Sequence, residues 1–156
     1  MSRNVMLEIF GGSDASNVDE FQRTNSLLLS DSYRQFLIEF NGGRPGNAEF
    51  GVAGWGSTLV NYFYGLSTQD AYSLEHAWER VNDHAGNEVL PIGADPGGWE
   101  VFLAVRGADA GAVYFYDHTN EESTPIRIAD SFEAFFNGLH PEGAFDDDGN
   151  FIAPDV

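Results

Sequence analysis

Apolar residues recur at helical spacing in three stretches of the chain, residues 33–40, 74–81 and 132–139. In each stretch they occupy positions i, i+3, i+4 and i+7, so one helix face carries them all, which predicts a helix packed against a core. These residues are Tyr33, Phe36, Leu37 and Phe40; Leu74, Ala77, Trp78 and Val81; and Phe132, Phe135, Phe136 and Leu139. A weaker helical pattern covers residues 17–25.

Polar residues at the starts of these stretches support the helix boundaries. Ser30 or Asp31 can cap the first helix and Ser73 the second, because their side-chain oxygens can accept a hydrogen bond from the first turn. Asp130 and Glu133 have the spacing of a capping box at the start of the third helix.

A period of two replaces the helical period between residues 99 and 118. Side chains of a strand point to opposite faces in turn, so this alternation predicts a β-hairpin whose second strand covers residues 112–118. A Pro/Gly loop over residues 90–98 precedes it. One face of the first strand carries Trp99, Val101, Leu103 and Val105, and the other carries Glu100, Phe102, Ala104 and Arg106.

Shorter strands are predicted around residues 50–52, 59–64 and 126–129. Helices and strands follow one another without βαβ alternation, which predicts an α+β fold with a twisted antiparallel sheet packed by helices. A chain of 156 residues suffices for one domain. We assign residues 1–140 to this domain and residues 141–156 to an acidic C-terminal tail, whose polar sequence with Gly and Pro predicts a loose segment.

The chain is strongly acidic, with 25 acidic residues against 7 basic ones and a formal net charge of −18. All seven basic residues are arginine. This charge disfavours nucleic acid and anionic membranes as partners, because both would be repelled. It favours a basic protein partner, although solubility alone or adaptation to high salt would account for the same composition.

Cysteine is absent, which rules out disulfides and thiolate metal sites and fits a reducing environment. The apolar run near the N-terminus is too short for a signal peptide or a membrane span. We therefore expect a cytoplasmic protein. Its oligomeric state stays open between a monomer and a weak dimer.

Motifs for catalysis or metal binding are missing or have poor geometry. Asp117 and His118 are adjacent, but neighbouring strand residues point to opposite faces and cannot easily work as one acid–base pair. His76 and His84 would lie about 12 Å apart along a helix, too far for one metal ion. Residues 146–150 resemble part of a calcium loop without Asp at its first and Glu at its last ligand position. We therefore expect a non-enzymatic protein with no catalytic residue, cofactor or metal.

Aromatic and acidic residues on predicted loops and strand ends are the best candidates for contact with a protein partner. Trp55 and Trp99 lie beside Gly-rich turns, where large aromatic rings can serve as binding anchors, although both rings could equally fill the core. Acidic residues near such loops would complement a basic partner. The partner-binding candidates are Glu49, Trp55, Asp95, Trp99, Glu100, Asp109, Asp117 and His118.

Three sequence blocks, in order and spacing, carry a resemblance to a known family. They are Ser32-Tyr33-Arg34-Gln35-Phe36-Leu37 leading to Asn41-Gly42-Gly43; Leu90-Pro91-Ile92-Gly93 to Val113-Tyr114-Phe115-Tyr116-Asp117-His118; and Ile128-Ala129-Asp130-Ser131-Phe132-Glu133-Ala134-Phe135. The blocks resemble the SUKH superfamily, which includes a fungal cell-wall-synthesis regulator and many bacterial toxin-immunity proteins. One departure is Leu29-Ser30, which stands where the family usually has Leu-Pro.

The resemblance implies the SUKH fold and a bacterial immunity protein that binds and occludes a toxin domain in a polymorphic-toxin or contact-dependent system. Such a toxin is often a nuclease, and a basic nuclease cleft would accept an acidic protein by complementary charge. The alternative is an intracellular protein-binding scaffold or regulator related to cell-wall signalling.

Overall fold

The computed structural model describes residues 6–11, 13–85, 88–117, 122 and 124–152. The helices are α1 (Ala15–Asn25), α2 (Asp31–Glu39), η2, a short 3-10 helix (Asp70–Tyr72), α3 (Leu74–Ala85) and α4 (Phe132–Asn137). The strands are β1 (Met6–Ile9), β2 (Gly43–Pro45), β3 (Glu49–Val52), β4 (Gly56–Leu59), β5 (Tyr62–Phe63), β6 (Val89–Ala94), β7 (Glu100–Ala104), β8 (Val113–Tyr116) and β9 (Ile126–Ala129).

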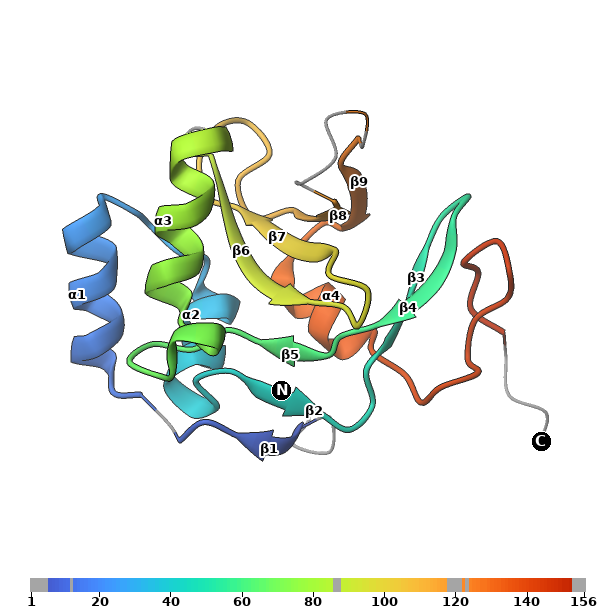
Figure 1. Ribbon diagram of the computed structural model, residues 1–156, viewed down its shortest axis with the longest axis horizontal. Helices are drawn as coiled ribbons and strands as arrows, with labels where there is room; N and C mark the ends of the chain where they lie inside the picture. Colours follow the sequence, from blue (N-terminus) through green and yellow to red (C-terminus); the bar gives the residue numbers. More distant parts are fainter. Residues whose placement is uncertain (1–5, 12, 86–87, 118–121, 123, 153–156) are drawn as a thin grey trace.

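Within the described ranges, seven strands form the main sheet in the order β1-β2-β5-β6-β7-β8-β9, and each neighbouring pair is antiparallel. Strands β3 and β4 form a separate hairpin that projects beside the sheet (Figure 1). Helices α2 and α4 lie behind the sheet in this view, and α3 runs along β6. The predicted α+β fold with an antiparallel sheet and packed helices is confirmed.

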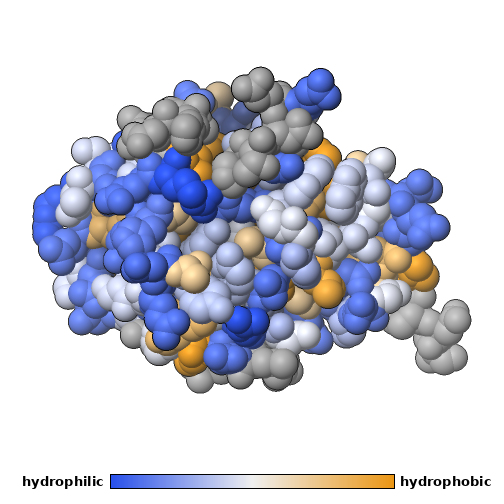
Figure 2. All heavy atoms as spheres, viewed as in Figure 1, coloured by the Kyte–Doolittle hydropathy of each residue, from blue (hydrophilic) through white to orange (hydrophobic). Residues whose placement is uncertain are grey.

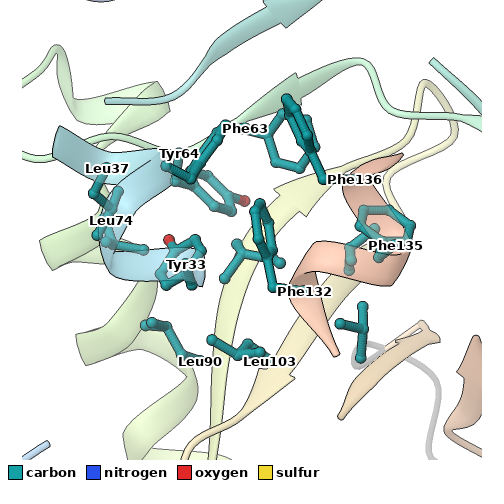
Figure 3. Packing of buried hydrophobic residues seen from close by; sticks show 14 of the residues in the cluster. Tyr33, Leu37, Phe63, Tyr64, Leu74, Leu90, Leu103, Phe132, Phe135 and Phe136 are labelled. Carbon is teal, nitrogen blue, oxygen red and sulfur yellow. The ribbon is translucent and has the colours of Figure 1, made fainter. Parts of the chain in front are cut away.

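Aromatic rings from the helices and the sheet meet in one core, part of which is drawn in Figure 3. The ring of Phe36 in α2 lies 5.1 Å from that of Phe63 in β5 and 5.0 Å from that of Phe132 in α4, measured between centroids. Such rings bury large apolar areas and so dominate core energetics. The predicted helix phases are confirmed, because Phe36, Phe40, Trp78, Phe132 and Phe135 are buried. Val101, Leu103 and Phe115 of the hairpin are buried as well.

The helix caps agree with the sequence prediction in one case and differ in another. The Ser73 side-chain oxygen accepts a hydrogen bond from the His76 backbone N–H at 3.2 Å, as expected for a cap of α3. At α4 the prediction of Asp130 as the cap is wrong, because Ser131 occupies that position and accepts from the Ala134 N–H at 3.0 Å. Asp130 instead accepts a hydrogen bond from Arg127 Nε at 3.1 Å and lies 3.0 Å from Arg127 Nη2.

The predicted Pro/Gly loop over residues 90–98 is wrong for its first half, because β6 runs through it and pairs with both β5 and β7. Pro91 cannot donate a ladder hydrogen bond, and the register shifts between Pro91 and Gly93, which accommodates the proline inside the sheet. Leu90 and Ile92 are fully buried in the core.

The strand predicted over residues 59–64 divides between two sheets. The Val60 N–H donates to the Ala48 carbonyl beside the β3–β4 hairpin, whereas the next residue, Asn61, donates to the Ala94 carbonyl of β6. The chain therefore leaves β4 and enters β5 of the main sheet within two residues. At the sheet edge, β1 and β2 were not predicted, and Gly43 of β2 lies so close to the Glu8 carbonyl that no side chain would fit there.

Residues 140–152 are packed against the β3–β4 hairpin, which contradicts the expectation of a loose tail for this part of the chain. Glu49 and His140 exchange backbone hydrogen bonds of 2.9 and 3.0 Å. The Gly54 N–H in the hairpin turn donates to the Asp148 carbonyl at 3.0 Å. Gly149 contacts the backbone of Gly51 and of the hairpin turn so closely that neither glycine leaves room for a side chain.

Candidate functional site

Two tryptophans form a partly exposed pair where the β3–β4 hairpin meets the end of β7. Trp55 lies in the hairpin turn and Trp99 directly precedes β7, and their ring centroids are 5.4 Å apart. Both rings contact Phe115 of the core, at 5.6 and 5.2 Å. Trp55 is 45% exposed and Trp99 is half-buried. The pair therefore closes one end of the core and still offers apolar surface to a partner.

Asp95 holds the turn that delivers Trp99. Its Oδ1 accepts hydrogen bonds from the backbone N–H groups of Gly97 and Trp99, both at 2.9 Å. Its Oδ2 accepts from the Thr58 hydroxyl of β4 at 2.9 Å, which ties the β6–β7 turn to the hairpin. Gly98 has a φ of 93°, a left-handed conformation that suits glycine. Asp95 therefore fixes the position of Trp99 relative to Trp55.

The buried Glu100 carboxylate forms an ion pair with a half-exposed arginine on α3. Arg80 Nη1 and Nη2 donate to its two carboxylate oxygens at 2.8 and 3.0 Å, a bidentate geometry that is the strongest form of this contact. The Tyr64 hydroxyl donates to Glu100 Oε2 at 2.8 Å. The Glu100 hydrogen bonds raise the pKa of Arg80, and burial together with the nearby Glu100 charge raises the pKa of Tyr64.

An open hollow of ≈ 520 Å³ lies between α3 with η2 on one side and β5 with the β6–β7 turn on the other. We call it the tyrosine hollow. Its lining includes Tyr62, Tyr64, Asp70, His76, Arg80, Asp95, Pro96, Gly98 and Glu100.

Of the remaining sequence candidates, the three that the structure describes do not line the tyrosine hollow. Asp109 is exposed at the opposite end of the β7–β8 pair and lies 3.4 Å from Arg127 Nη1. Glu49 is buried, and its Oε2 accepts from the Gly143 N–H at 2.6 Å. Asp117 follows β8 at the same end as Trp99 and is half-buried. His118 lies outside the described residues.

The structure thus brings together Trp55, Trp99, Asp95 and Glu100, but it gives the two acids internal roles. Glu49, Asp95 and Glu100 are 5%, 8% and 3% exposed, so their side chains offer almost no surface to a partner. The expectation that these carboxylates are available on loops is therefore wrong, because each one accepts hydrogen bonds from within the chain. Sequence reasoning also missed Tyr62, Tyr64 and Arg80, although the i, i+2 spacing of the two tyrosines in an extended segment signals a shared face.

Within the residues that the structure describes, no three metal-ligating side chains come together. Over the same ranges, no helix has the length and apolar character needed to cross a bilayer. The prediction of a protein without metal or enzymatic activity stays a prediction.

The architecture is that of a single α+β domain whose helices pack on an antiparallel sheet, with the partly exposed Trp55 and Trp99 side by side at the start of β7. Residues 12–138 match the family model described as SMI1 / KNR4 family (SUKH-1), so the chain belongs to this family. No curated protein matches the sequence. The suspected membership of the SUKH superfamily is confirmed.

Proposed function

We propose that this chain is a non-enzymatic bacterial immunity protein of the cytoplasm that binds a basic toxin domain and blocks its active surface. The observation that carries the proposal is the Trp55–Trp99 pair, an apolar anchor held rigidly on the surface of a chain with a net charge of −18. Interfaces concentrate their binding energy in a few such aromatic residues surrounded by polar ones.

The charge supports a basic partner. The face of the molecule seen in Figure 1 is mainly hydrophilic, with hydrophobic residues only in small separate areas (Figure 2). The net charge of −18 should raise the rate of encounter with a basic protein, and it should repel nucleic acid that a nuclease toxin would otherwise bind. Binding alone would therefore block a basic cleft, and the immunity protein would need no catalytic residue.

The rigidity of the anchor supports tight binding. Asp95 holds the Trp99 backbone, Thr58 links this turn to the hairpin, and the Asp148 carbonyl holds the Gly54 N–H beside Trp55. A surface that is already ordered loses less conformational entropy when it binds.

The decisive experiment is co-expression with the toxic domain encoded beside this chain, in cells that the toxin kills. We expect wild-type protein to protect them and Trp55→Ala or Trp99→Ala to lose protection, with at least about 2 kcal/mol of binding free energy lost at a true hot spot. Leu28→Ala is the matched control, because Leu28 is also exposed, at 84%, but lies in the connection between α1 and α2. Circular dichroism establishes that each variant is folded.

Kinetics on the purified pair tests the role of charge. Asp147→Arg should slow association more than Asp109→Arg, because the Asp147 backbone lies beside Gly56 of the tryptophan-bearing hairpin. Association should also slow as the salt concentration rises, when screening shortens to about 8 Å near 0.15 M. Absence of binding at low salt would contradict the immunity function and favour a scaffold or regulator of cell-wall signalling.

A further inference from the structure

We infer that the tyrosine hollow receives an arginine side chain of the protein partner. The inference rests on the proposed protein-binding function, and it names the chemistry of one contact within that interface.

The hollow adjoins the tryptophan pair through the β6–β7 turn. Asp95, Pro96 and Gly98 line the hollow, and the next residue of the turn is Trp99. A partner that covers Trp55 and Trp99 therefore has the hollow within reach of one long side chain. The volume of ≈ 520 Å³ leaves ample room for such a side chain.

Tyrosine rings line one side of the hollow and favour a planar cation. Tyr62 lies edge to face with Tyr64 at 5.4 Å and with Tyr72 at 5.0 Å. The faces of aromatic rings attract cations, and a guanidinium can also stack on them, which an ammonium cannot. Arginine therefore fits these rings better than lysine.

The chain itself makes the same contact next to the hollow. The Arg44 guanidinium lies 5.6 Å from the centre of the Tyr72 ring, and its Nη2 donates to the Tyr72 hydroxyl at 2.7 Å. Tyr72 in turn packs against Tyr62 of the hollow. An arginine of the partner that lies on the Tyr62 ring would make the same kind of contact on the neighbouring ring.

The charges of the lining residues also favour a cation. Asp70, Asp95 and Glu100 carry carboxylates, whereas the arginine among the lining residues, Arg80, is paired with both oxygens of Glu100. The Asp70 side chain is 94% exposed and lies 3.5 Å from His76 Nδ1. It is therefore the carboxylate at the rim that can turn towards an incoming guanidinium.

The test uses the isotope-labelled full chain and short peptides, followed by two-dimensional NMR. The probe is acetyl-Gly-Arg-Gly-amide, and the control peptides replace arginine with citrulline, which has nearly the same shape without the charge, or with lysine. We expect the arginine peptide to shift the signals of Tyr62, Tyr64 and residues 95–98, and to bind roughly two- to fivefold more tightly than either control.

Matched variants separate a local site from general attraction to an acidic protein. Asp70→Asn should weaken the arginine peptide by roughly two- to fivefold. Glu133→Gln removes the same charge from an exposed position on α4 and should leave its affinity unchanged. Tyr62→Leu should weaken binding with an unaltered circular dichroism spectrum.

Equal affinity for the arginine and citrulline peptides, equal affinity for the arginine and lysine peptides, or an equal loss in Asp70→Asn and Glu133→Gln would each overturn the inference. None of these measurements involves a toxin. If the peptides fail to bind while Trp55→Ala still abolishes protection, the arginine site is wrong and the immunity function stands.

Discussion

The two faces of strand β7 are both buried, but they are built from different chemistry. Val101 and Leu103 belong to the core that the phenylalanines of α2 and α4 fill, and we call this side the core face. On the opposite side, which we call the tyrosine face, Glu100 bonds to Arg80 and Tyr64. Further along this side, Phe102 stacks on Tyr116 at 4.5 Å.

The difference shows how one strand can join a face stabilised by apolar packing to a face stabilised by hydrogen bonds. The core face is apolar, so its contribution grows with the area removed from water and needs no directional contacts. The tyrosine face depends on hydrogen bonds with defined geometry, because a buried charge without a partner is strongly destabilising. Its tyrosine rings and Arg80 also reach the tyrosine hollow, so this face alone combines burial with an accessible surface.

The largest expected effect is on the core face. Phe36→Ala should lower the free energy of unfolding by about 3–5 kcal/mol, because it removes a fully buried ring and leaves a cavity among other rings. Leu28→Ala, at an exposed position between α1 and α2, should lower it by less than about 1 kcal/mol. Chemical denaturation measures the free energy of unfolding of both variants. Similar losses in the two variants would contradict the assignment of Phe36 to the core.

The next effect tests the ion pair of the tyrosine face. Arg80→Leu leaves the Glu100 carboxylate, 4% exposed, without its charged partner and should cost about 3 kcal/mol of unfolding free energy. The double variant Arg80→Leu with Glu100→Leu should recover much of that loss, since no unpaired charge remains. Arg34→Leu breaks a surface pair with Asp19 and should cost less than about 1 kcal/mol. A double variant as unstable as Arg80→Leu would show that the buried charge is not the cause.

Alkaline pH should weaken both faces, because burial raises the pKa of Tyr33 on the core face and of Tyr64 on the tyrosine face. An unfolded tyrosine titrates near pH 10, so above about pH 10 the unfolded state releases protons that the folded state retains. The tyrosines should therefore leave the unfolding free energy unchanged below this pH and lower it above this pH by about 1.4 kcal/mol per pH unit for each such tyrosine. Denaturation curves at several pH values measure the slope, and Tyr33→Phe should reduce it.

The smallest expected effects come from removing the hydroxyl groups of Tyr64 and Tyr33. Tyr64→Phe removes a hydrogen bond to a carboxylate and should cost about 1.5 kcal/mol. The buried Tyr33 hydroxyl has no hydrogen-bond partner within the part of the chain that the structure describes, so Tyr33→Phe at neutral pH should be neutral or stabilising by up to about 1 kcal/mol. Melting temperatures distinguish the two, and a larger loss for Tyr33→Phe would contradict the contrast between the faces.

The sequence alone determined the helices, the β7–β8 hairpin, the core residues and the acidic character. Each of these follows from local spacing or composition: Phe36 and Phe132 repeat with the helical period, and Val101 and Leu103 with the period of a strand. Trp55 and Trp99 could also be singled out as candidates for partner contact, because both lie beside glycine-rich turns.

Only the tertiary structure decided which polar residues are available to a partner. Glu100 and Asp95 looked like surface acids, but their partners Arg80 and Thr58 lie 20 and 37 residues away in the chain, a separation at which no local pattern reports a contact. The same holds for the C-terminal segment, which docks on the hairpin through the close approach of Gly51 and Gly149. Local periodicity records which face of an element is apolar, whereas ion pairs, backbone contacts and hollows arise only when distant elements are brought together.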